Sequence, residues 1–486
     1  MGQMKPFIHE LAGFDPLEAF AAVSDMPYSL LLDSADPGHP GSRYSFVVCH
    51  PIETIESKNG LITVTNWEQQ TTFNGDPFAL IKDRMESWVQ DTEHVHGLPP
   101  FQGGAAGFFG YDLGRCLEDL PSSAEDNPNM PDMAIGIYDQ VLAHDHIQEK
   151  TWLITHARSE SEARVKQKYV LRLFGQPLQL REHEQSDLHW EPNFEAPDYK
   201  DHIRKVIDYI EGGDVFQVNL AQRFDAALPE NFSPFAHYLK LREVNPAPFA
   251  SYMDLGPVKI SSASPEQFLR VKDRQVETRP IKGTRPAVED PAIDRLYRNS
   301  LENSEKDKAE NIMIVDLLRN DLSKVCKKKS IEATELCKLE SFASVHHLVS
   351  TVKGELKSSK SALDMMRGCF PGGSVTGAPK IRAMEIIEEL EPTRRGPYCG
   401  AMAYIGFDGS MDSSILIRTL VYDGNQVSLQ TGGGIVADSK PDEEYQETFD
   451  KADAIFRSFE DRSNIHIEDL DEDSAQDSTE NWAESA

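Results

Sequence analysis

The sequence lacks paired cysteines. Its six cysteines are scattered, and no two form a C-x-x-C pair: Cys49, Cys116, Cys326, Cys337, Cys369 and Cys399. This spacing argues against a zinc site and against a disulfide framework. We therefore expect a protein of a reducing compartment.

The sequence also lacks long apolar runs. Residues Met1 to Glu10 contain no apolar core of the kind found in a secretory signal, and no later stretch is apolar enough to cross a membrane. We expect a soluble, unexported, cytoplasmic protein that does not bind membranes.

A basic excess is missing as well. The chain has 49 Lys and Arg against 80 Asp and Glu, a net charge of −31. This balance argues against binding nucleic acid, because no surplus of cations exists to replace the counterions of phosphates. An anionic substrate would have to be attracted locally, by a metal ion, an Arg side chain or a helix N-terminus.

The order of the predicted elements indicates an α+β protein with many hairpins. Arg43–Val48 and Leu61–Val64 flank Asn59-Gly60, a strong hairpin-turn signal. A second hairpin is expected between Ile135–Tyr138 and Trp152–Thr155, and a strand over Ile415–Val421.

Helices are expected where apolar residues recur with helical spacing. Asp198 is the expected cap of one helix, and Gly212-Gly213 is its expected stop. Further helices are predicted at Phe78–Val89, Ser304–Leu322, Pro379–Leu390 and Pro441–Phe459.

Composition divides the chain into three parts. Polar residues 159–197 predict a boundary between an amino-terminal region, 1–160, and a catalytic domain, 190–462. From Glu468 to Ala486 the chain has no basic residue and few apolar ones. We expect residues 466–486 to form a disordered acidic tail.

One stretch combines rigid backbone with a lysine. Two prolines restrict Glu277 to Pro286 to an extended conformation around Lys282. Lys282 is flanked by Arg279 and Arg285, and neighbouring cations favour the uncharged, nucleophilic form of an amine. The alternative is a surface loop with three solvated cations.

The final helix places Glu444, Glu447 and Lys451 on one face. These residues are typical of a solvated helix whose first-turn acids complement the helix dipole and whose Glu447–Lys451 pair is an i,i+4 ion pair. They also suit a Mg²⁺ site, for which Glu310 on the preceding long helix is a candidate third carboxylate.

Other candidate residues stand in glycine-rich or isolated positions. Gly372–Lys380 leads into a predicted helix and suits an anion, while Gly432–Gly434 is either a ligand-contacting strand or a bulge. Glu266 is a candidate general acid, with a solvated carboxylate as the alternative. His346 and His347 remain an ambiguous pair.

Taken together, these segments resemble the chorismate-utilising enzymes, the family that includes anthranilate, isochorismate and aminodeoxychorismate synthases. The resemblance extends from about Ser34 to Phe456. It is strongest in Arg279–Thr284, Glu310–Asp321, Gly377–Lys380 and Glu444–Lys451. It implies a fold of two large facing antiparallel β-sheets with helices packed outside.

The resemblance also implies the reaction. Members that make 4-amino-4-deoxychorismate, on the route to 4-aminobenzoate and folate, typically carry Lys at position 282, where members that make anthranilate carry Ala. Lys282 therefore implies amination of chorismate, with anthranilate formation for tryptophan synthesis as the alternative. The implied ammonia donor is a separate glutamine amidotransferase subunit in a heterodimer, since the cysteines fit no nucleophile elbow.

The residue roles that the resemblance implies fall into four groups. The catalytic group is Lys282 as nucleophile, Glu266 as acid and His347; the metal group, for Mg²⁺, is Glu310, Glu444 and Glu447. The substrate group is Thr284, Ser374, Tyr398, Arg418, Gly432, Gly433, Gly434 and Lys451. A tryptophan pocket is implied for Ser34, Ser42, Arg43, Tyr44, Pro248, Phe249 and Ala250, with Asp33 where feedback-inhibited members have Glu.

Overall fold

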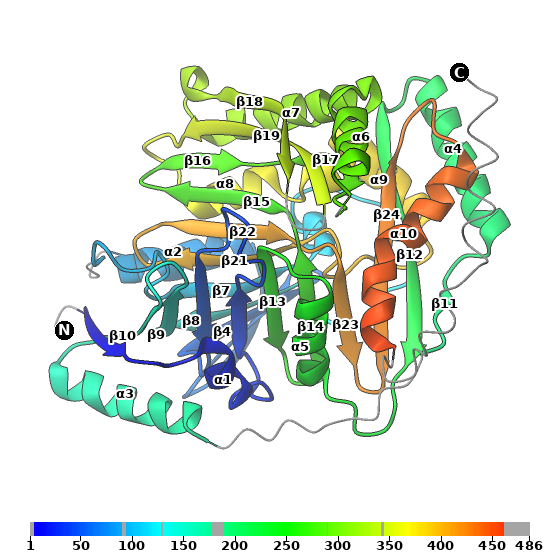
Figure 1. Ribbon diagram of the computed structural model, residues 1–486. Helices are drawn as coiled ribbons and strands as arrows, with labels where there is room; N and C mark the ends of the chain where they lie inside the picture. The colour runs from blue at the N-terminus through cyan, green and yellow to red at the C-terminus, as the bar shows by residue number, and fades with distance from the viewer. Residues whose placement is uncertain are drawn as a thin grey trace.

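The protein folds around two large β-sheets. The computed structural model describes residues 4–89, 94–127, 130–176, 188–288, 290–341 and 345–460. Within these residues each sheet has twelve strands, and helices pack outside them (Figure 1). The expected α+β fold of two large antiparallel sheets is confirmed.

The first sheet runs in the order β1-β10-β9-β3-β2-β13-β14-β23-β24-β12-β11, with β20 also paired to β12. Its strands are β1 (Lys5–Leu11), β2 (Leu30–Asp33), β3 (Tyr44–Val48), β9 (Gln140–Asp145), β10 (Lys150–Ala157), β11 (Glu191–Pro192), β12 (Gln217–Ala227), β13 (Phe249–Asp254), β14 (Val258–Ser264), β20 (Gly377–Ala378), β23 (Thr419–Asp423) and β24 (Gln426–Ile435).

The second sheet runs in the order β17-β19-β16-β15-β22-β21-β7-β8-β4-β5-β6, with β18 also paired to β19. Its strands are β4 (Glu53–Lys58), β5 (Leu61–Asn66), β6 (Gln70–Asn74), β7 (Gly104–Phe109), β8 (Met133–Tyr138), β15 (Gln267–Lys272), β16 (Gln275–Thr278), β17 (Ile281–Pro286), β18 (Glu332–Ser341), β19 (Val345–Glu355), β21 (Ala401–Gly406) and β22 (Met411–Ile415).

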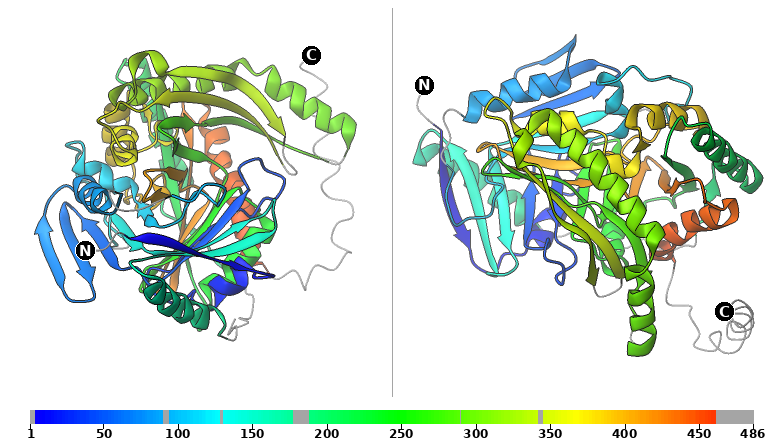
Figure 2. Two further views of the ribbon diagram at one scale, coloured as in Figure 1. Left: turned by 90° about the vertical axis from the view of Figure 1, so that its left-hand side faces the viewer. Right: turned by 90° about the horizontal axis from the view of Figure 1, so that it is seen from above.

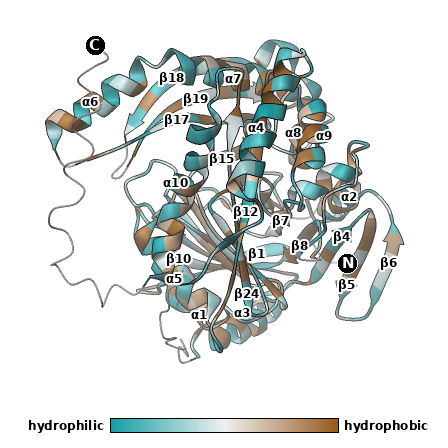
Figure 3. Cartoon of the chain, turned by 90° about the vertical axis from the view of Figure 1, so that its right-hand side faces the viewer, coloured by the Kyte–Doolittle hydropathy of each residue, from teal (hydrophilic) through white to brown (hydrophobic). Residues whose placement is uncertain are grey.

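The α-helices of the described residues are α1 (Pro16–Ala21), α2 (Pro77–Val89), α3 (Glu160–Phe174), α4 (Ala196–Glu211), α5 (Pro234–Val244), α6 (Pro291–Glu302), α7 (Glu305–Val325), α8 (Ala362–Cys369), α9 (Lys380–Leu390) and α10 (Pro441–Phe459). Peripheral helices such as α4 and α6 show hydrophilic and hydrophobic residues in turn along their length (Figure 3). None of the helices in the described ranges combines the length and the hydropathy needed to span a bilayer.

The inner faces of the two sheets pack against each other. One buried cluster joins Phe46 and Ile260 of the first sheet to Phe108, Met402 and Tyr404 of the second. Two further clusters lie on the outer faces. In one, α1, α3, α5 and α10 cover the first sheet; in the other, α2, α7 and α8 cover the second sheet, while α4 and α9 pack against β12 of the first (Figure 2). All six cysteines are free thiols.

Three strand predictions were wrong because the chain changes sheets. The Asn59-Gly60 hairpin exists, but its first strand is β4, while β3 belongs to the other sheet. Likewise β8 pairs with β7 and β4, whereas β10 pairs with β9 and β1. The predicted strand Ile415–Val421 is broken between β22 and β23. An apolar pattern reports burial of a strand, not which of two sheets buries it.

Most of the predicted helices are confirmed. The helix over Pro441–Phe459 has the expected bounds, and α2 and α7 agree within a few residues. The helix that ends at Gly212-Gly213 begins at Ala196 with Glu195 as its N-cap, so Asp198 lies in the first turn and is not the cap. Proline at the start of this helix supplies the fixed φ that favours initiation there.

Both sheets combine strands from the two predicted regions. In the second sheet, for example, β7 of the amino-terminal region pairs with β21 of the catalytic region. The division into 1–160 and 190–462 stays a prediction, and the predicted acidic tail 466–486 lies outside the described residues.

Candidate active site

Lys282 lies in the second sheet, in β17. The predicted extended segment is confirmed: β17 pairs with β19, with a register shift between Lys282 and Thr284. Gly283 has φ of +76°, and a Cβ there would lie 2.8 Å from Leu301. Glycine therefore permits the register shift in β17, which orients the Lys282 side chain. The Lys282 Nζ donates to the carbonyl oxygen of Ser374, at 3.3 Å.

The two arginines beside Lys282 are neutralised by carboxylates. Arg279 pairs with Glu340, and Arg285 lies 3.2 Å from Asp307. Each cation is thus balanced by its own partner, and the expectation that the two arginines favour the neutral form of Lys282 stays a prediction.

Glu266 is buried beside the lysine, with 6 % of its surface exposed. It lies where the chain passes from β14 in the first sheet to β15 in the second. The Ser374 hydroxyl donates to Glu266 Oε1 at 2.9 Å. Burial raises the pKa of Glu266 from 4.5 to about 7, although Ser374 and Lys282 oppose the rise. A carboxyl with this pKa is suited to donate a proton near neutral pH.

Arg418 lies at another crossing between the sheets, from β22 to β23. Its φ is +52°, and its carbonyl accepts from the Ala263 N–H at 3.1 Å. Burial lowers the pKa of Arg418, and among the described residues no ion pair joins its guanidinium to a carboxylate. A partly buried cation without a carboxylate partner is suited to bind a carboxylate of a ligand.

His347 and Arg418 line the same cavity, of about 270 Å³, whose wall includes Phe249 and Ile281. The His347 Nδ1 lies 2.9 Å from the Thr284 hydroxyl. Burial, with Arg418 second, lowers the pKa of His347 to about 4, so the imidazole is neutral. The other member of the ambiguous pair, His346, forms hydrogen bonds with Ser341 and Asp294 and does not line this cavity.

The glycine run Gly432–Gly434 is regular strand, not a bulge. It continues β24, which pairs with β12 without a register shift. A Cβ on Gly433 would lie 3.1 Å from Glu444 Oε2 and 3.6 Å from Glu447 Oε1, so glycine lets two carboxylates approach the backbone. The Lys451 Nζ bonds Glu447 Oε1 at 2.6 Å and the Gly432 carbonyl at 2.7 Å.

Glu310, on α7, faces the same group of charges. Burial raises the pKa of Glu310, and Lys282 opposes the rise while Glu447 reinforces it. Burial also raises the pKa of Glu444, again with Glu447 contributing. In the described part of the chain no three His, Cys, Asp or Glu side chains lie close enough to form a metal cluster. The carboxylates nevertheless fit Mg²⁺, which takes one or two protein carboxylates and completes its shell with water and substrate oxygens.

The other glycine-rich segment reaches α9 through a short turn and a short strand, and the expected anion site there stays a prediction. Gly373–Val375 is a short 3-10 turn, and β20 separates it from α9. Lys380, the first residue of α9, bonds Asp321 at 2.6 Å and two backbone carbonyls. The segment instead supplies Ser374 between Lys282 and Glu266.

Sequence reasoning missed Gln217. Its side chain is 1 % exposed, its Oε1 has no hydrogen-bond partner, and a Cβ on Gly434 would lie 2.0 Å from its Nε2. This buried amide oxygen lies beside the glycine strand and can accept a hydrogen bond from a ligand or from water. A glutamine between the apolar residues Phe216 and Val218 was the available signal.

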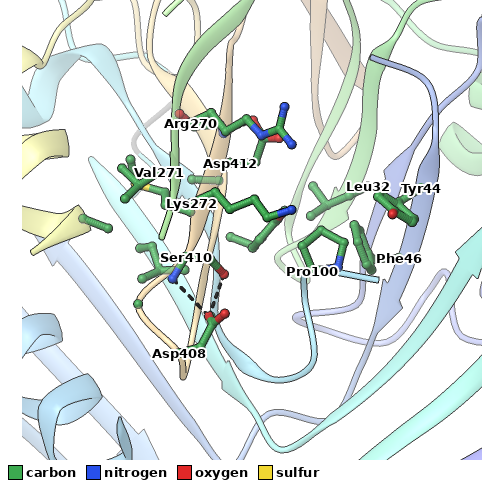
Figure 4. Close-up of a pocket in the computed structure, with 18 of the residues that line it drawn as sticks. Leu32, Tyr44, Phe46, Pro100, Arg270, Val271, Lys272, Asp408, Ser410 and Asp412 are labelled. Carbon is green, nitrogen blue, oxygen red and sulfur yellow. Dashed lines mark hydrogen bonds between the residues drawn. The ribbon is translucent and has the colours of Figure 1, made fainter. Parts of the chain in front are cut away.

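A second cavity, of about 1150 Å³, opens between the two sheets (Figure 4). All the predicted tryptophan-pocket residues line it except Ser42, which is buried nearby. Figure 4 shows Leu32, Tyr44 and Phe46 on one side and Arg270 and Asp412 on the other.

The carboxylate of Asp33 is occupied. Its Oδ2 accepts from Tyr238 and from Arg242, both at 2.9 Å, so the group is held against α5. Its Oδ1 accepts from the Ser45 hydroxyl at 3.2 Å, and Asp33 also lines the cavity.

Comparison with known proteins agrees with this geometry. The family model for chorismate binding enzymes matches residues 28–457. Aminodeoxychorismate synthase component 1 of Escherichia coli (strain K12) is 43% identical over 443 residues, 91% of this chain and 95% of that protein. Anthranilate synthase component 1 of Thermus thermophilus is 39% identical over 459 residues, 94% of this chain and 97% of that protein.

A solved structure shows the same fold. The crystal structure of anthranilate synthase component I from Streptococcus pneumoniae TIGR4 superposes with a TM-score of 0.76 at 34% identity, covering 85% of this chain and 92% of that one. With a family match from residue 28 to 457 and relatives that align along nearly their whole length, the chain belongs to the family of chorismate-binding enzymes.

Proposed function

We propose that the chain converts chorismate and ammonia to 4-amino-4-deoxychorismate. The observation that carries the proposal is the bridge at Ser374, whose hydroxyl donates to Glu266 while its carbonyl accepts from Lys282. One residue thus holds a nucleophilic amine and a proton donor on the same side of the site.

In the proposed mechanism, the neutral Lys282 amine adds at C2 of the ring. The C4–O bond breaks, and Glu266 gives its proton to the departing hydroxyl, which leaves as water. Ammonia then adds at C4, the bond from C2 to Lys282 breaks, and the extra proton on the new amine returns to Glu266. The covalent intermediate replaces one difficult displacement by two easier ones.

Binding is assigned to the remaining residues. Arg418 pairs with one substrate carboxylate, near His347 and Thr284, while Tyr398 and Gly432–Gly434 complete the wall. Mg²⁺ would be held by Glu310 and Glu444, with Glu447 beside them, and would supply positive charge for the ring carboxylate. This arrangement lets an acidic protein retain a dianion.

The ammonia is proposed to come from a separate glutamine amidotransferase subunit. The cavity between the sheets is proposed to hold tryptophan, on the strength of its aromatic lining by Tyr44, Phe46 and Tyr404. Calorimetric titration with L-tryptophan tests that assignment, and an absence of heat at millimolar ligand would refute it.

A product assay tests the main proposal. Purified chain, chorismate, Mg²⁺ and ammonium at alkaline pH should form a product that yields 4-aminobenzoate once a 4-amino-4-deoxychorismate lyase is added. The relatives include anthranilate synthases of similar identity, so anthranilate is the competing product. Its appearance would overturn the proposal, and binding without turnover would indicate a non-catalytic subunit.

Replacing Gly433 by alanine should weaken the binding of Mg²⁺ by about 10- to 100-fold, the effect usual for disturbed metal surroundings. The new Cβ would lie 3.1 Å from Glu444 and must displace its carboxylate. The measurement is the Mg²⁺ concentration that gives half-maximal turnover. Gly38→Ala is the control, since its Cβ meets only Asp36, at 3.4 Å. An unchanged Mg²⁺ requirement in Gly433→Ala would remove Glu444 from the metal site.

A further inference from the structure

We infer that Arg395 is a positioning residue of the active site, one that fixes Ser374, Tyr398 and β12 relative to one another. The inference rests on the proposed function only in naming the reaction that this arrangement serves. Arg395 is 2 % exposed and follows α9 by five residues.

The guanidinium of Arg395 makes four hydrogen bonds, to groups from three different segments. It donates from Nη1 to the Val375 carbonyl at 2.9 Å and from Nη2 to the Asn219 carbonyl at 2.5 Å. Nε and Nη2 also form a fork with the carboxylate of Glu391, at 2.9 and 2.6 Å. Such a planar, charge-assisted set of bonds fixes the orientation of every partner.

Two aromatic rings confine the same guanidinium. Its central carbon lies 4.7 Å from the centre of the Tyr111 ring and 5.6 Å from that of Tyr398. Tyr398 is one of the residues assigned to the substrate wall. Arg395 therefore sets the place of this ring by a cation–π contact in a buried setting.

The contacts of Arg395 reach the catalytic pair through one peptide unit. Val375 directly follows Ser374, whose hydroxyl bonds Glu266 and whose carbonyl receives Lys282. On the other side, Asn219 pairs with Gly434 of the glycine strand. A single buried cation thus joins the turn that holds the catalytic pair to the strand that forms the opposite wall.

Glu391 fixes the Arg395 guanidinium relative to β12. Its Oε1 accepts from the Ala221 N–H at 2.9 Å, so the carboxylate anchors the fork to β12. A buried, hydrogen-bonded ion pair is costly to break, because removing one partner leaves the other charged without compensation.

The test is Arg395→Lys, which keeps the charge but cannot reach Val375, Asn219 and Glu391 together. We expect kcat for chorismate turnover to fall about 100-fold, as for a displacement of about 1 Å in an active site, with KM changed far less. Arg115→Lys is the matched control. Arg115 also pairs with a buried carboxylate, Glu388 of α9, but contacts no residue of the site.

A second readout separates positioning from a purely structural role. The protonated-carboxyl band of Glu266, identified as the one that Glu266→Gln removes, is titrated by infrared difference spectroscopy. The groups that face Glu266 are the Ser374 hydroxyl, Lys282, Lys451, the Ile281 N–H and the Cys399 thiol. The Ser374 bond lowers the pKa of Glu266, so its loss in Arg395→Lys should move the titration to higher pH.

The outcomes are distinct. Wild-type kcat and an unmoved titration in folded Arg395→Lys would overturn the inference. If Arg395→Lys does not fold, Glu391→Gln replaces it, since it loosens the fork that holds the Arg395 guanidinium against Val375 and Asn219; it should lower kcat and raise the same titration. If the wild-type protein makes no product, the proposed function fails while the spectroscopic titration still decides the role of Arg395.

Discussion

Replacing Lys282 by alanine is expected to lower kcat by about 10²- to 10⁴-fold, the range typical of a positioned catalytic group. It is also expected to abolish a covalent adduct. In the wild type, rapid acid quenching during turnover followed by peptide mass spectrometry should show a mass increase on the peptide that carries Lys282. Any turnover that remains in Lys282→Ala would come from direct attack of ammonia at C4.

Lys353→Ala is the control for this experiment. Lys353 lies on β19, the strand next to Lys282, but its ammonium group is exposed and pairs with Glu277 at 3.3 Å. It should keep wild-type turnover and the adduct. Full turnover in Lys282→Ala, or a wild-type adduct on another residue, would remove Lys282 from the mechanism.

Replacing Glu266 by glutamine should also lower kcat by about 10²- to 10⁴-fold, because the amide cannot give a proton to the departing hydroxyl. The pH dependence of kcat/KM provides an independent test of the role of Glu266. Burial raises the pKa of Glu266 to about 7, so the required protonated form predominates below that pH and is lost above it. At a fixed concentration of uncharged ammonia, the ratio of wild-type kcat/KM to that of Glu266→Gln should therefore fall about tenfold per pH unit above about 7, because the titration of any other group affects both proteins alike.

The pH profile of kcat/KM for Glu266→Gln should lack the decline that Glu266 causes above pH 7 in the wild type. Glu355→Gln is the control, because Glu355 lies on β19 of the same sheet, lines neither cavity and pairs with the exposed Lys327. If Glu266→Gln retains the decline above pH 7, another group titrates there and Glu266 is not the acid.

The two catalytic residues differ in how far the sequence could predict them. Lys282 is conspicuous because prolines and glycine surround it, and those residues restrict the backbone wherever they occur. Glu266 is a single carboxylate in an unremarkable strand end. Its raised pKa arises from burial between β14 and β15, and burial depends on elements far away in the chain.

Arg395 and Gln217 illustrate the same limit. Their partners, among them Val375, Asn219 and Gly434, come from segments separated by many residues. Such long-range contacts leave no periodic pattern or characteristic spacing in the local sequence, so sequence reasoning missed both side chains. The partners of Arg279 and Arg285 likewise come from other elements, Glu340 on β18 and Asp307 on α7, and the local sequence does not show them.

By itself the sequence determined the local conformations: the Pro441–Phe459 helix, the Asn59-Gly60 turn and the extended segment around Lys282. Apolar period, turn chemistry and proline act over a few residues, so they can be recognised from the residues alone. Only the tertiary structure decided which sheet each strand joins, and with it that Glu266 and Arg418 lie where the chain crosses between the sheets. That choice depends on packing two faces against each other, which couples residues hundreds of positions apart.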